Sequence, residues 1–121
     1  MKPPRDDTFP DPLWHEVDRA GATAVLFTRR GLRLLKAGAR KAAVNELQQA
    51  FSAGNTDPNV RYNLGTALLE LGRYREALDA LEGAATDSLS DEYKDAFPRE
   101  KRALIYDNIG VVHTKLGELK A

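Results

Sequence analysis

Residues 63–84 read Asn63-Leu64-Gly65-Thr66-Ala67-Leu68-Leu69-Glu70-Leu71-Gly72-Arg73-Tyr74-Arg75-Glu76-Ala77-Leu78-Asp79-Ala80-Leu81-Glu82-Gly83-Ala84. Apolar side chains recur every three or four positions on both sides of Gly72, a spacing that predicts two amphipathic helices. Gly72 lies where the first apolar series ends, as expected of a residue that closes a helix. Gly65, Ala77 and Ala84 lack bulk, so the two helix axes can approach closely while leucines fill the remaining space. We therefore predict a helical hairpin with a tight turn at Gly72.

The same pattern occurs twice more along the chain. Displaced by 34 residues toward the N-terminus, the small residues of this hairpin coincide with Gly31, Gly38, Ala43 and Ala50, and its leucines coincide with Leu34, Val44 and Leu47. Displaced by 45 residues in the other direction, Asn63-Leu64-Gly65 recurs as Asn108-Ile109-Gly110. A third unit is therefore present, separated from the second by 11 additional residues.

A 34-residue period of helix-turn-helix units resembles the tetratricopeptide repeat. The family places Leu-Gly, Tyr, Gly, Tyr, Ala, an aromatic residue and Ala in slots that hold Leu64, Gly65, Leu68, Gly72, Tyr74, Ala77, Leu81 and Ala84. The first unit keeps Phe27 in the usual Trp slot, but Arg30 and Arg40 replace Leu and Tyr. The resemblance covers about residues 24–121. It implies an all-α superhelix of two complete hairpins and the first helix of a third.

The domain boundaries follow from this register. We expect a flexible leader at 1–10, because its prolines and charges offer too little apolar surface to offset the entropy of ordering. A tetratricopeptide domain at 11–121 then comprises repeats at about 24–57 and 58–91, an insertion at about 86–97, and a truncated repeat at 103–121. The truncation leads us to expect that the chain is a fragment of a longer repeat protein.

Helix boundaries can be predicted from caps and breakers. Pro12 begins the first helix, and we favour a break near Gly21. The helix that contains Ala85 ends there, and the last helix runs from Pro98 to about Leu116. Trp14 either covers the flank of the first repeat or protrudes as an anchor for a partner.

Composition excludes several classes of function. Lys and Arg total 18, Asp and Glu also total 18, and no cysteine is present, so no charge imbalance favours nucleic acid. His15 and His113 lie in different units without a nucleophile motif, and no phosphate loop or metal-binding motif occurs. We predict no enzyme activity, no cofactor and no metal. No apolar run reaches the roughly 20 residues of a membrane span, so a cytoplasmic location is expected.

The resemblance implies that the first helix of each unit lines a concave, peptide-binding groove. The side chains turned into that groove would be Thr28, Leu32, Leu35, Tyr62, Asn63, Thr66, Leu69, Glu70, Asp107, Asn108, Val111 and Lys115. In the family, an Asn at the position of Asn63 often hydrogen-bonds the backbone of a bound peptide; a cap or a solvent contact is the alternative.

Chaperone-binding members of the family grip a terminal carboxylate with Lys, Asn and Arg side chains from three units. The corresponding slots here hold Thr28, Leu32, Asn63, Leu104 and Asn108, of which only Asn63 matches. An acidic chaperone tail is therefore disfavoured as the ligand.

Two functions remain after these exclusions. The first is a scaffold or adaptor that binds a peptide or helix of a partner protein in the groove, and the second is a structural module that self-associates. Self-association would use an apolar stripe on the last helix, which we expect to be uncovered and to form a two-fold homodimer: Ile105, Ile109, Val112 and Leu116.

Overall fold

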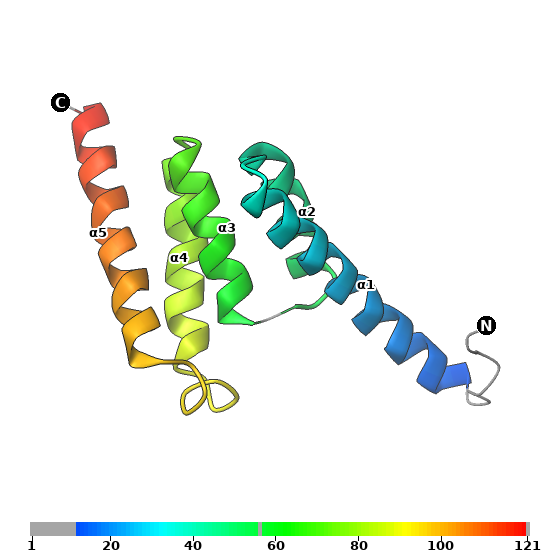
Figure 1. Cartoon of the computed structure of the whole chain (residues 1–121). Coiled ribbons are helices and arrows are strands. Elements are labelled where there is room, and N and C mark those ends of the chain that lie inside the picture. Colours follow the sequence, from blue (N-terminus) through cyan, green and yellow to red (C-terminus); the bar gives the residue numbers. More distant parts are fainter. Residues whose placement is uncertain (1–11, 56, 121) are drawn as a thin grey trace.

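The computed structural model describes residues 12–55 and 57–120, with side chains from 21–55 and 57–119. Within these residues the chain forms five α-helices and no strand (Figure 1). The helices are α1 (Pro12–Lys36), α2 (Arg40–Ser52), α3 (Pro58–Glu70), α4 (Tyr74–Ser88) and α5 (Arg99–Lys120). The predicted all-α fold is confirmed. The predicted leader at 1–10 and the side chain of Trp14 lie outside the described residues.

In each complete hairpin, one glycine closes the first helix: Gly38 follows α1 and Gly72 follows α3. Gly38 and Gly72 have φ angles of 81° and 78°, a left-handed conformation that costs glycine little. After α3, the Gly72 amide donates to the Leu69 carbonyl at 3.0 Å and the Arg73 amide donates to the Leu68 carbonyl at 2.9 Å. The same pair of bonds follows α1. The predicted turn is therefore present in both hairpins and satisfies carbonyls that a helix end leaves unpaired.

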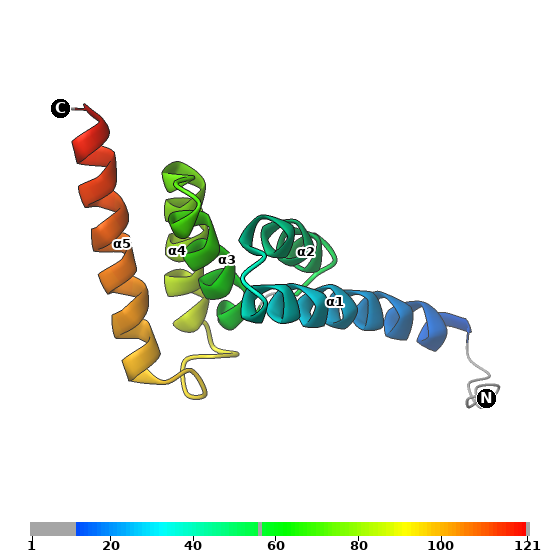
Figure 2. The ribbon, with the colours of Figure 1, turned by 45° about the horizontal axis from the view of Figure 1, so that its top comes forward.

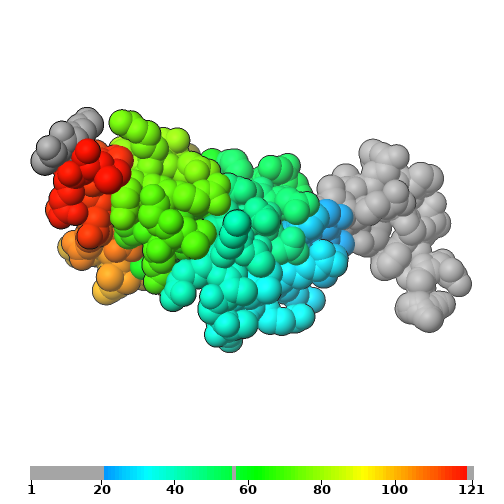
Figure 3. Space-filling model, turned by 90° about the horizontal axis from the view of Figure 1, so that it is seen from above, coloured from blue at the N-terminus to red at the C-terminus, as the bar shows by residue number. Residues whose placement is uncertain are grey.

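The helices stack in chain order. Within the hairpins α2 packs on α1 and α4 packs on α3; between them, α2 contacts α3 and α4 contacts α5. Two views place α1 and α5 at opposite ends of the stack (Figures 1 and 2). From above, the surface likewise passes from α1 and α2 through α3 and α4 to α5 (Figure 3). The core follows this path through the fully buried side chains of Leu47, Leu68, Leu81 and Ile105.

The predicted break near Gly21 is wrong, because α1 is continuous from Pro12 to Lys36. A glycine inside a helix costs only about 1 kcal/mol relative to alanine. Gly21 is flanked by Ala20 and Ala22, which favour helix, so its cost does not interrupt the helix.

The segment between α4 and α5 differs from its predicted bounds. Helix α4 continues past Ala85 to Ser88, and α5 begins at Arg99 and extends beyond Leu116 to Lys120. The connection at 89–98 is held by Arg102, whose guanidinium donates to the backbone carbonyls of Ser88 at 2.8 Å and Lys94 at 2.9 Å. Phe97 is buried against the core. The connection is thus a folded part of the domain.

Candidate functional site

The predicted groove residues lie on α1, α3 and α5, and α3 contacts both of the other helices. On α3, four of the five predicted side chains are half-buried, and Glu70 is exposed. Tyr62 and Thr66 lie one helical turn apart on the same face of α3. The Thr66 hydroxyl donates to the Tyr62 carbonyl at 2.9 Å. Helix α3 therefore occupies the centre of the candidate site.

Besides Thr66, three predicted groove residues are already engaged by the protein itself. The Thr28 hydroxyl donates to the Ala24 carbonyl and accepts from the Asn55 amide, both at 2.8 Å. Glu70 accepts a 2.6 Å hydrogen bond from Arg40 Nε, which joins α3 to α2. On α5, Lys115 Nζ lies 3.8 Å from Glu118 Oε1. A ligand would have to compete for these groups.

Other polar groups of the site are free. Within the described part of the chain, no hydrogen bond or ion pair engages the side chains of Tyr62, Asn63, Asp107 or Asn108. Asn63 is half-buried, so its amide is partly desolvated and still offers one carbonyl and two N–H donors. It is thus suited to pairing with an extended peptide backbone.

The apolar members of the groove set divide into covered and exposed side chains. Leu35 and Leu69 pack partly against the core and serve the fold as well as the surface. Leu32 on α1 is 38% exposed and Val111 on α5 is 43% exposed. The two open apolar contacts of the predicted set therefore lie on the outer helices and flank the polar residues of α3.

The predicted self-association stripe is not uncovered. Ile105 and Val112 are fully buried within the single chain, and Ile109 and Leu116 are half-buried against the same core. The expectation was wrong because α4 packs along α5 and covers this stripe. These four side chains therefore stabilise the stack, and a second copy cannot reach the two buried ones.

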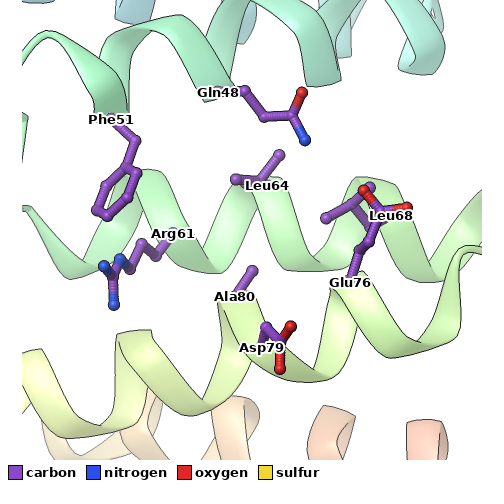
Figure 4. Close-up of a pocket in the computed structure, with 8 residues that line it drawn as sticks. All are labelled: Gln48, Phe51, Arg61, Leu64, Leu68, Glu76, Asp79 and Ala80. Carbon is purple, nitrogen blue, oxygen red and sulfur yellow. The ribbon is translucent and has the colours of Figure 1, made fainter.

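The sequence did not reveal a pocket that lies between α2, α3 and α4. Its volume is about 310 Å³, and Figure 4 shows the eight residues that line it. Leu64 and Leu68 of α3 form part of the lining, together with Ala80 of α4 and Gln48 of α2. At one end the Arg61 guanidinium lies 4.1 Å from the centre of the Phe51 ring and 3.3 Å from an Asp87 carboxylate oxygen. The sequence signal that could have indicated this pocket is Phe51, an aromatic residue in the slot that holds Ala85 in the next repeat. In the structure the Phe51 side chain is exposed.

The rim of this pocket carries two carboxylates with different surroundings. Glu76 accepts hydrogen bonds from Arg73 at 2.9 and 2.7 Å, and these bonds lower the pKa of the Glu76 carboxyl below its usual value. Asp79 has no ion pair or hydrogen bond to another described residue. Asp79 is therefore the rim carboxylate that is available to a ligand.

Two features are absent from the described residues: a cluster of metal-ligating side chains and a membrane-spanning helix. No group of three or more His, Cys, Asp or Glu side chains in the described ranges is placed to hold a metal ion. None of the helices in the described part of the chain combines the length and the apolar character that crossing a bilayer requires.

Comparison with known proteins adds two findings. A family model described as tetratricopeptide repeat matches residues 34–104. Superkiller complex protein 3 of Mus musculus is 42% identical over 66 residues, which is 54% of this chain. The matching region spans only 4% of the length of the mouse protein.

Proposed function

The chain belongs to the tetratricopeptide repeat family, and from this premise we propose that it binds a segment of a partner protein along α1, α3 and α5. Repeats of this family generally mediate protein–protein interaction. The module binds and does not catalyse, and its partner is a protein, not a nucleic acid. A cytoplasmic location is part of the proposal.

The free amide of Asn63 is the observation that carries this proposal. An extended peptide presents unpaired backbone N–H and C=O groups, and an amide side chain can pair with one of each. The Tyr62 ring beside it offers apolar surface and a free hydroxyl. Because both groups are half-buried and unpaired within the described chain, a ligand would satisfy them without breaking an existing bond.

The flanking residues support a particular chemistry for the partner. Two slots that hold cationic or amide side chains in chaperone-binding relatives contain Leu32 and Leu104 here, and both leucines are exposed. Apolar surface on the outer helices favours a peptide whose central backbone groups face Asn63 and whose flanking side chains are apolar. We therefore propose an internal, partly apolar segment as the ligand in place of an acidic C-terminus.

A binding experiment tests this function. Peptides selected from a displayed library on the wild-type chain are titrated against Tyr62→Ala/Asn63→Ala by calorimetry. We expect this double variant to weaken binding by about 2 kcal/mol or more, because it removes an aromatic contact and a partly buried hydrogen bond. The matched control is Asn45→Ala, an exposed residue of α2 without a described partner. Equal affinity of the wild type and the double variant would place the binding site on another surface.

A further inference from the structure

The pocket of Figure 4 lies on the side of α3 that faces away from the groove of the proposed function. With about 3.6 residues per helical turn, Leu64 and Leu68 lie on the opposite side of α3 from Tyr62 and Thr66. The pocket volume of about 310 Å³ is near the lower end of the range of about 300–1,000 Å³ found for ligand sites. The pocket is therefore sized for a single side chain or a small molecule.

The floor of the pocket is apolar and lies between three helices. Leu64 and Leu68 of α3 are 7% and 1% exposed, and Ala80 of α4 is half-buried beside them. Phe51 of α2 stands exposed at one end (Figure 4). An apolar stem that lay on this floor would leave water on most of its surface, which favours its binding.

The free polar atoms of the pocket are mostly hydrogen-bond acceptors. Within the described part of the chain, the side chains of Gln48 and Asp79 make no hydrogen bond or ion pair. Glu76 accepts one bond on each carboxylate oxygen from Arg73, and a carboxylate has about four acceptor sites. A ligand that fills the pocket must therefore donate several hydrogen bonds.

The charges around the pocket leave one carboxylate without a partner. Arg61 lies 3.3 Å from an Asp87 carboxylate oxygen, and Arg73 lies 2.7 Å from Glu76. Asp79 is not ion-paired with any described cation. In Figure 4 the Arg61 guanidinium is at one end of the pocket, and Glu76 is at the other. The pocket is therefore electrostatically complementary to a cation that enters beside Asp79.

We propose that this pocket binds an arginine side chain of a partner protein, with its methylene stem on Leu64 and Leu68 and its guanidinium at Asp79. A guanidinium presents five N–H donors in a planar fork that matches carboxylate oxygens. One end of the pocket already holds such a group, since Arg61 lies 4.1 Å from the centre of the Phe51 ring. A lysine ammonium is a compact charge with three donors and uses the dispersed acceptors less well.

The arginine belongs to a protein, because the pocket suits a side chain better than a free amino acid. Repeats of this family generally mediate protein–protein interaction. Free arginine also carries an α-carboxylate, and the two arginines beside the pocket, Arg61 and Arg73, are already paired. Inside a protein chain that carboxylate is part of a neutral amide, and the exposed Phe51 ring can contact the neighbouring residue.

A nuclear magnetic resonance titration of the full chain tests the proposal, with N-acetyl-arginine methylamide as the probe. This molecule imitates an arginine within a protein. We expect saturable shifts of the Gln48 and Asp79 resonances, with a Kd of about 1 mM. Asp79→Asn keeps the shape of the side chain and removes its charge, and it should weaken binding about fivefold. Ala80→Leu fills the floor and should abolish saturable binding.

Matched variants make the test specific. Glu82→Gln removes the same charge from an exposed residue of α4 outside this pocket and should leave the Kd unchanged. Tyr62→Ala/Asn63→Ala should also retain binding, which separates this pocket from the groove of the proposed function. Thermal melting should show that Asp79→Asn is folded.

Five outcomes would each overturn the proposal. They are the absence of saturable binding to the wild type, equal binding by Asp79→Asn, equal binding of N-acetyl-lysine methylamide, tighter binding of free arginine, and a dimer of the chain that Asp79→Asn dissociates. The last two would assign the pocket to a small molecule and to a second copy of the chain.

Discussion

At the scale of single residues, Gly65 and Gly110 share a repeat slot and a helical backbone but differ in what surrounds them. Gly65→Leu would force its side chain into Leu81, and overpacking typically costs about 1–3 kcal/mol. Gly110→Leu enters open space and removes a helix-weakening glycine, a change of up to about 1 kcal/mol in the stabilising direction. Urea denaturation measures both. If the two variants lose equal stability, the contact of Gly65 with Leu81 does not hold the hairpin together.

Arg61 is a second residue whose role can be measured. It stacks on Phe51 and pairs with Asp87, so it joins α2, α3 and α4 at the end of the pocket. Arg61→Ala should cost about 1–2 kcal/mol, the sum of a cation–π contact and a partly exposed ion pair. Arg61→Lys retains the charge but loses the planar stacking group, so its loss should be intermediate. A double-mutant cycle with Asp87→Asn separates the two contributions, and a zero coupling energy would exclude the ion pair as a stabilising contact.

At the scale of elements, the connection at 89–98 depends on one side chain of α5. Arg102 donates to the Ser88 and Lys94 carbonyls and approaches the buried Phe97 ring at 6.0 Å. Arg102→Met keeps an unbranched apolar stem in place of the arginine stem and removes these donors. We expect faster amide hydrogen exchange in 89–98 while α1 and α2 are unchanged. Unaltered exchange in the connection would show that Phe97 alone anchors it.

At the scale of the whole molecule, the burial of Ile105 and Val112 changes the expected oligomeric state. These side chains pack in the core of a single chain, so they offer no apolar surface to a second copy. We expect light scattering to report a monomer across a dilution series up to high micromolar concentration. A dimer that persists on dilution would require an interface elsewhere, and Tyr106→Ser would then test whether the exposed ring on α5 contributes.

The sequence by itself determined the helices and the turns that pair them. Apolar spacing and a glycine at each turn are local features, and their recurrence at 34 residues was sufficient to predict the hairpins that close at Gly38 and Gly72. A weak local signal gave a wrong helix boundary. Gly21 resembled a breaker, but its small propensity cost did not outweigh the helix around it.

The tertiary structure alone decided which faces are covered. Gly65 and Gly110 are equivalent in sequence, yet one meets a leucine and the other meets none, because only long-range packing places a second helix over the slot. For the same reason α4 buries the stripe of Ile105 and Val112. Long-range packing also brings Phe51 of α2 against Arg61 of α3, where the two side chains form one end of the pocket. Periodicity identifies an apolar face, but the element that covers it depends on how distant parts of the chain pack.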